Sequence, residues 1–94
     1  MIAANSYSQS TFGVVLGEVK DGSGAVIRGA RVRLTNTAEN SARDVVSDGN
    51  GVYEFQNVKA GPYSVTVNSA GFRASTTTGL TLVARQTLRV DAIM

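Results

Sequence analysis

The sequence predicts an all-β fold, a seven-stranded antiparallel sandwich of two sheets. No window of about 11 residues or more places apolar side chains at i, i+3, i+4 and i+7 without a glycine or turn signal inside it. Thirteen Val and nine Thr residues favour strands instead, because β-branched side chains suit a pleated surface. Turn signals recur about every 8–12 residues, a spacing typical of a sandwich.

The length of 94 residues indicates one small domain. It excludes a two-domain enzyme or an eight-unit βα barrel. Residues 1–11 are small and polar, and we expect them to form a flexible segment. Residues 12–94 form the expected domain.

The first two strands are expected at residues 12–20 and 29–36, separated by an Asp-Gly-Ser-Gly turn at 21–24. In the first, Val15, Gly17 and Val19 share one face. The second alternates cleanly, with one face apolar and the other polar. Its inward residues are Ala30, Val32 and Leu34, and its outward residues are Arg31, Arg33 and Thr35.

The next two strands, at 42–47 and 52–56, flank Asp48–Gly51, which is the strongest hairpin signal in the chain. Tyr53 and Phe55 are expected in the core, and Glu54 on the opposite face. A turn over 57–62 precedes a strand at 63–69. A short polar strand at 73–78 is expected at an edge, and one or two more strands within 80–94.

The composition excludes several classes of chemistry. Cys and His are both absent, which removes disulfides, thiolates, the commonest metal ligand and the commonest general base. The formal net charge is +2, without a run of like charge, so nucleic-acid binding is not indicated. No apolar run is long enough to span a membrane, and the first residues do not form an intact signal peptide.

Several motifs follow one another in a specific order. They are Leu16–Asp21, Ser23–Ile27, Gly29–Asn36, Ser47–Phe55, Gly61–Val67 and Ala70–Arg73. Together they resemble the carboxypeptidase regulatory-like domain, a prealbumin-like (transthyretin-like) β-sandwich, over roughly residues 12–94. The tail motifs, Gly79–Leu82 and Gln86–Val90, resemble the version at the N-terminus of TonB-dependent outer-membrane receptors of acidobacterial type. The chain departs from the common pattern where Arg28, and Lys59 or Ala60, stand in place of Pro.

This resemblance implies a noncatalytic accessory module without cofactors, in the periplasm or outside the cell. Its expected role is that of an interaction or spacer module of a larger cell-envelope protein, specifically the N-terminal domain of such a receptor. Its expected partners are other domains of the parent protein, with a protein or carbohydrate ligand as a further candidate. A carbohydrate- or peptide-binding module of a secreted protein or enzyme is the alternative. A small hydrolase is disfavoured, because Ser has no His partner.

Two clusters have a chemical and a structural interpretation. Asp48, Asn50 and nearby Asp44 could supply oxygen ligands to calcium, or simply form a turn, which is the interpretation we favour; no metal is predicted. Glu18, Lys20 and Asn68 could form an intramolecular isopeptide bond. That reaction requires a buried, neutral Lys, and all three residues are expected to be solvated.

The remaining candidates are surfaces. Arg31 and Arg33, joined by Arg43, form either a solvated sheet face or a surface that docks an acidic partner. Tyr7, or Phe72 if it is exposed, could stack on a sugar. Phe72 is otherwise expected to plug the core beneath the last loop.

Overall fold

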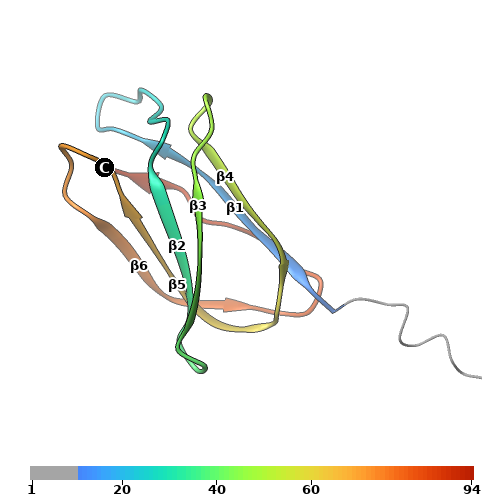
Figure 1. Cartoon of the computed structure of the whole chain (residues 1–94). Helices are drawn as coiled ribbons and strands as arrows, with labels where there is room; N and C mark the ends of the chain where they lie inside the picture. The colour runs from blue at the N-terminus through green and yellow to red at the C-terminus, as the bar shows by residue number, and fades with distance from the viewer. Residues whose placement is uncertain (1–10) are drawn as a thin grey trace, which may run out of the picture.

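The fold consists of two β-sheets packed face to face (Figure 1). A computed structural model describes residues 11–94 of the chain. The strands, in chain order, are β1 (Gly13–Lys20), β2 (Arg31–Asn36), β3 (Ser41–Val46), β4 (Val52–Val58), β5 (Gly61–Asn68), β6 (Ser75–Leu82), β7 (Thr87–Arg89) and β8 (Ala92–Ile93). The predicted all-β sandwich is confirmed, and the described residues contain no helix.

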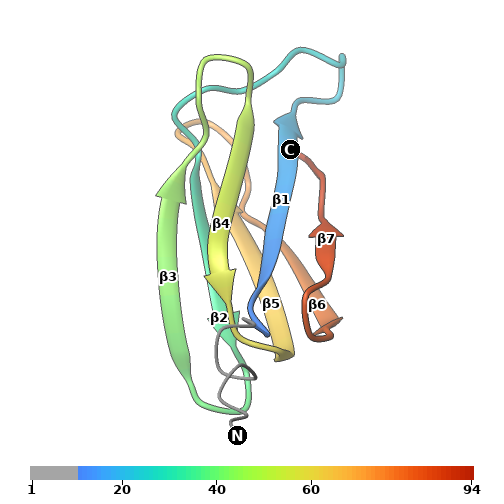
Figure 2. The same cartoon turned by 90° about the vertical axis from the view of Figure 1, so that its right-hand side faces the viewer.

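The first sheet has the order β4-β1-β7, with β8 also paired to β1, and the second has the order β3-β2-β5-β6. Two details differ from the prediction. Residues 11–94 form eight strands rather than seven. In addition, β7 and β8 pair with β1 in parallel, whereas every other strand pair is antiparallel. Figure 2 shows β7 running beside β1 in the same direction.

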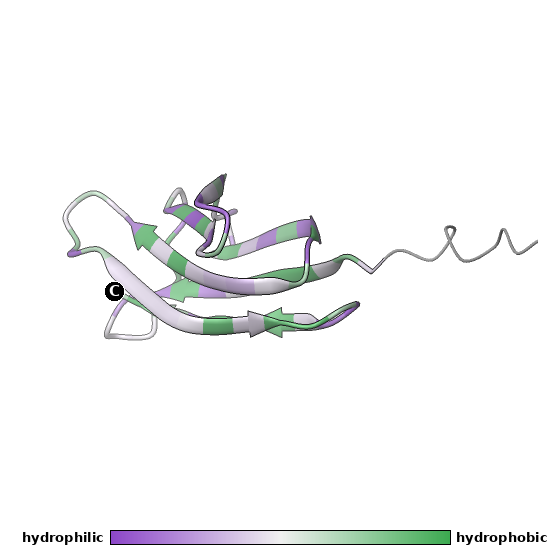
Figure 3. Ribbon diagram, turned by 90° about the horizontal axis from the view of Figure 1, so that it is seen from below, coloured by the Kyte–Doolittle hydropathy of each residue, from purple (hydrophilic) through white to green (hydrophobic). Residues whose placement is uncertain are grey.

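The core lies between the sheets and follows from the period-two pattern of the strands. In β1, buried residues alternate with partly exposed ones along the whole strand. In β2 and β5 the Val and Leu positions predicted to face inward are buried. The hydropathy of the ribbon alternates accordingly (Figure 3). The largest fully buried side chains are Phe55, Leu34, Leu82, Val15, Val19, Val32, Val58, Val65 and Val67.

Some predicted boundaries are wrong. β5 already begins at Gly61, so the expected turn over 57–62 is reduced to the link between Val58 and Gly61. The edge strand expected at 73–78 is found as β6, which starts and ends later. Phe72 does not plug the core, because 41% of its surface is exposed. The expected flexible segment falls mostly on residues 1–10, outside the described residues.

The contact between β1 and the last two strands is unusually close at Gly17. The carbonyl oxygen of Val90 lies so near that a Cβ at Gly17 would be 1.9 Å from it. This oxygen accepts a hydrogen bond from the buried hydroxyl of Tyr53. Burial and the nearby Asp91 carboxylate raise the pKa of Tyr53 to about 12, so the phenol stays protonated and can donate.

The close contact at Gly17 also interrupts the hydrogen-bond ladder along β1, at the point between its pairing with β7 and its pairing with β8. Val90 N–H donates to the Leu16 carbonyl at 2.8 Å. One residue later, the carboxylate of Asp91 accepts from Glu18 N–H at 2.9 Å. The side chain therefore supplies an acceptor where the ladder is broken, and pairing resumes at Val19 and Ala92. The last strands are thus held along the full length of β1.

We predict that Gly17→Ala is strongly destabilising. The added methyl group would overlap the Val90 carbonyl and force β7 and β8 away from β1, at a cost of about 3 kcal/mol or more. Urea unfolding at 25 °C measures this. Gly22→Ala is the matched control, because a Cβ at Gly22 meets nothing within 4 Å, and its cost should stay within about 0.5 kcal/mol. Equal stability of the two variants would contradict the close approach.

Candidate functional site

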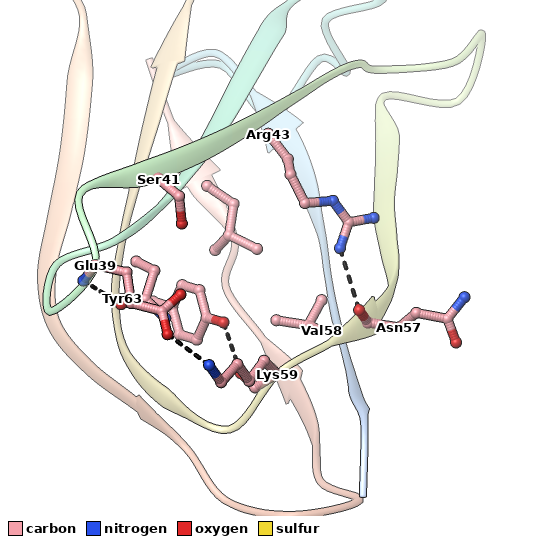
Figure 4. A pocket seen from close by; sticks show the side chains of 9 residues that line it. Glu39, Ser41, Arg43, Asn57, Val58, Lys59 and Tyr63 are labelled. Carbon is pink, nitrogen blue, oxygen red and sulfur yellow. Dashed lines mark hydrogen bonds and ion pairs between the residues drawn. The ribbon is translucent and has the colours of Figure 1, made fainter. Parts of the chain in front are cut away.

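A cavity of about 160 Å³ opens on one side of the sandwich, where β3 and β4 are the neighbouring edges of the two sheets (Figure 4). Its buried lining residues are Leu34, Asn36, Val58 and Tyr63, and its other lining residues are polar and exposed. The lining residues are Leu34, Asn36, Glu39, Ser41, Arg43, Asn57, Val58, Lys59 and Tyr63. We call this opening the β3–β4 seam.

One end of the seam is closed by the loop between β2 and β3. The side-chain oxygen of Asn36 accepts from the backbone N–H groups of Ala38 and Glu39, both at 3.0 Å. Asn40 follows in a left-handed conformation, at φ 59°, which Asn tolerates better than most residues. This turn presents Glu39 to Lys59, and the two side chains form an ion pair.

The link between β4 and β5 forms the other wall. Asn57, at φ 55°, lies where the β1–β4 register shifts, and this bend turns Val58 into the core. The Tyr63 hydroxyl donates to the Lys59 carbonyl at 2.6 Å. The hydrogen bond and charge of Glu39 raise the pKa of Lys59, so Lys59 stays protonated at neutral pH.

Arg43 spans the seam. It faces Leu34 across the β2–β3 pair, and cross-strand partners share a face, so its side chain lies on the inner side of β3. Its Cζ lies 5.6 Å from the ring centroid of Phe55, a cation–π distance. Its Nη1 donates to the Asn57 carbonyl at 3.4 Å. Among residues 11–94 no carboxylate lies within ion-pair distance of Arg43.

The structure does not bring together the three arginines suggested as one surface. Arg31 and Arg33 project from the outer face of β2, whereas Arg43 points inward from β3. Arg33 is bound by Asp44, with contacts of 2.8 and 3.0 Å to the two carboxylate oxygens. Arg31 borders a shallow depression with Asn68 and Ser69. The outer stripe is therefore partly neutralised, and docking there remains a prediction.

In the loop considered for calcium, the side chain of Asp48 accepts hydrogen bonds from the backbone of the loop itself. Asp48 Oδ1 accepts from the N–H groups of Asn50 at 2.8 Å and Val52 at 3.0 Å, which is the pattern of an Asx turn. Asp44 is held by Arg33 on the neighbouring strand. No group of three or more acidic side chains that could hold a metal is found in the described part of the chain.

The isopeptide candidates lie on opposite sides of the molecule. Glu18 and Lys20 form an ion pair, 3.2 Å between Oε1 and Nζ, on the outer face of the first sheet. Asn68 is exposed on the outer face of the second sheet. The core of the sandwich separates Lys20 from Asn68, so the bond cannot form in this fold.

For sugar stacking, Phe72 is available on the surface, and Tyr7 lies outside the described residues. The sequence did not reveal the seam, because Val45 and Val46 are both apolar and the pattern of β3 does not decide which of them faces inward. In the structure Val45 packs against the core, and a period of two puts Arg43 on the same face as Val45. The other members, Glu39 and Lys59, come together only through the lengths of two turns, which local patterns do not reveal.

Comparison with known proteins supports the same architecture. The family model described as "carboxypeptidase regulatory-like domain" matches residues 14–94. A search of curated proteins finds no match. Within the described residues no helix is long and apolar enough to cross a bilayer.

Solved structures with a similar fold include parts of much longer chains. The Bacillus anthracis TIE protein is 20% identical over 88% of this chain and 16% of its own, with a TM-score of 0.69. A chain of a type II cohesin–X-dockerin complex from Acetivibrio cellulolyticus is 21% identical over 85% of this chain and 52% of its own, with a TM-score of 0.68. The major pilin SpaD from Corynebacterium diphtheriae is 15% identical over 87% of this chain and 29% of its own, with a TM-score of 0.64. The chain thus spans between about a sixth and a half of the length of these structures. Their similarity to this chain concerns the fold alone.

We predict that the Arg33–Asp44 pair makes stability depend on acid pH. The Arg33 hydrogen bonds hold the pKa of Asp44 below its ordinary 3.8. A depressed folded-state pKa contributes stability that is present above the ordinary pKa of the unfolded chain and is lost as pH falls through the lower folded-state pKa. The Asp44→Asn variant should therefore lose less stability than the parent between pH 7 and pH 2.5, measured by urea unfolding.

The matched variant is Arg33→Gln, which removes the cation and keeps the carboxyl group. The pKa of Asp44 is lowered only while Arg33 is present. The Arg33→Gln variant should therefore also show a smaller loss of stability between pH 7 and pH 2.5. If both variants retained the full pH dependence of the parent chain, the pair would have no role in acid sensitivity.

Proposed function

Because the chain belongs to the carboxypeptidase regulatory-like domain family, we propose that it is a noncatalytic accessory module that spaces and connects other parts of a larger cell-envelope protein. The observation that carries this proposal is the parallel pairing of β8 with the end of β1. Met94 N–H donates to the Lys20 carbonyl at 2.7 Å, so the chain leaves where β1 ends rather than where it begins.

This topology suits a module arranged in series. β1 rises about 26 Å over its eight residues, at about 3.3 Å per residue. Anything joined before β1 and anything joined after β8 would therefore be held at opposite ends of the sandwich (Figure 2). An antiparallel last strand would instead return the chain to its starting end. The close contact at Gly17 makes the connection stiff, because β7 and β8 cannot shift without breaking it.

The parent protein we propose is a TonB-dependent outer-membrane receptor, with this module in the periplasm at its N-terminus. The support is the resemblance of the tail, Gly79–Leu82 and Gln86–Val90, to that group. A noncatalytic role agrees with the side chains available. His and Cys are absent from the sequence, and the two lysines, Lys20 and Lys59, are both engaged in ion pairs.

A carbohydrate- or peptide-binding module of a secreted protein is the second candidate. Exposure of Phe72 favours a sugar-stacking site, since an aromatic ring at the surface can lie against the apolar face of a sugar. The β3–β4 seam favours a peptide.

Fractionation of the source cells distinguishes these proposals. An antibody against the 94-residue chain should detect a band much larger than the chain itself in the outer-membrane fraction, with the epitope accessible only after the outer membrane is permeabilised. A large band in the culture medium would favour the second candidate. A 94-residue species in the cytosol would refute both.

A further inference from the structure

We propose that the β3–β4 seam is a docking site for an extended acidic peptide segment, which adds to the free edge of β3 and places a carboxylate against Arg43. This proposal rests on the function proposed above, because it specifies a partner for the interaction module. Three independent features of the seam lead to it. They are the free backbone of β3, the orientation of Arg43, and the cavity behind it.

Within residues 11–94, β3 pairs with β2 alone, so the backbone groups on its other side have no strand partner there. Ser47 N–H donates to the Ala30 carbonyl, and the β2–β3 register is constant from there to the end of both strands. Hydrogen-bonded and non-hydrogen-bonded pairs alternate in an antiparallel ladder. Val45, Arg43 and Ser41 therefore bond to β2, while the backbone groups of Ala42, Asp44 and Val46 point away from the sheet. β3 is an edge strand, so these groups are open to a further strand.

The alternation also decides what a docked strand would meet. A residue directly opposite Arg43 would occupy a non-hydrogen-bonded pair, in which side chains approach most closely, and would lie on the inner face beside Arg43. An acidic residue there would pair with a guanidinium that lacks a carboxylate partner among residues 11–94. Stacking on the buried Phe55 ring already orders this side chain, which lowers the entropy cost of pairing.

The cavity provides room for the incoming side chain. Its volume of about 160 Å³ accommodates one side chain, and Ser41 and Tyr63 add hydroxyl groups to its lining (Figure 4). Lys59 on the far wall is already paired with Glu39, which leaves Arg43 as the cation of the seam without a carboxylate partner in the described chain. The seam therefore carries one uncompensated positive charge, which selects a peptide carboxylate over a neutral or basic side chain.

The strand at the opposite edge of the same sheet, β6, is less suited to the same role. β6 has no charged residue, and its register against β5 shifts between Tyr63 and Val65. Gly79, at φ 72°, lies opposite this shift. Such a bulge twists an edge and hinders the addition of a strand. β3 pairs with β2 without a shift.

The test is a titration of the ¹⁵N-labelled full chain with a blocked nonapeptide of alternating Thr and Val that carries a single central Glu. The control peptide has Gln in place of Glu. We expect shifts of the amide signals of Ala42, Asp44 and Val46 and of the Arg43 Nε signal, and binding about tenfold weaker for the Gln peptide, because a charge-assisted hydrogen bond is lost. Equal binding of the two peptides, or shifts centred on β6, would overturn the proposal.

Two variants separate the charge from the edge. Arg43→Gln should abolish the preference for Glu over Gln, whereas Arg31→Gln, on the opposite face of the same sheet, should keep it. Ala42→Pro removes an outward N–H without touching the β2–β3 bonds, so it should weaken both peptides while the chain stays folded by circular dichroism. Retention of binding by Ala42→Pro would exclude strand addition.

The outcome is distinguishable from that of the proposed function. Detection of the chain in the cytosol would refute the envelope module and leave the titration unchanged. An absence of peptide binding would refute the seam as a docking site and leave the location of the protein, and its role as a spacer, unchanged.

Discussion

The crossing of Val90 over Gly17 is the constraint on which the rest of the fold depends. A strand can pass this close only where the residue beneath has no side chain, and any Cβ at Gly17 would overlap the Val90 carbonyl. The buried Tyr53 hydroxyl and the Asp91 carboxylate satisfy the groups that the interrupted ladder leaves open. With these contacts in place, β7 and β8 follow β1 in parallel, and β8 extends the pairing with β1 as far as Lys20.

Much of the fold could be predicted from sequence, because it depends on local alternation. The inward faces of β1, β2, β4 and β5 follow the period-two pattern, and the hairpin turn at Asp48–Gly51 is encoded in its residues. The direction of the last strands could not be predicted in this way. Three residues of β7 and two of β8 carry too short a pattern to distinguish parallel from antiparallel pairing.

The candidate site shows the same division between local and nonlocal information. The arginines were recognised as exposed cations, yet their distribution over two faces depends on the β2–β3 register. Phe72 was expected in the core, but it lies between a turn at Ala70–Gly71 and the edge strand β6, and its side chain is exposed there. Glu39 and Lys59 meet only after two separate loops close on the same opening.

The parallel β1–β8 pairing holds the two ends of the module apart, and the distance between these ends can be measured. The native chain has no cysteine, so Thr11→Cys and Ile93→Cys provide two unique sites for spin labels, both at exposed positions. Pulsed electron–electron double resonance should give a single distance distribution centred at about 30 Å. Ile93 pairs with Lys20, and Thr11 precedes Lys20 by nine residues, which in an extended strand span about 3.3 Å each. A distribution centred below about 15 Å would mean that the last strand returns to the start of β1 and that the module does not hold its ends apart as a spacer.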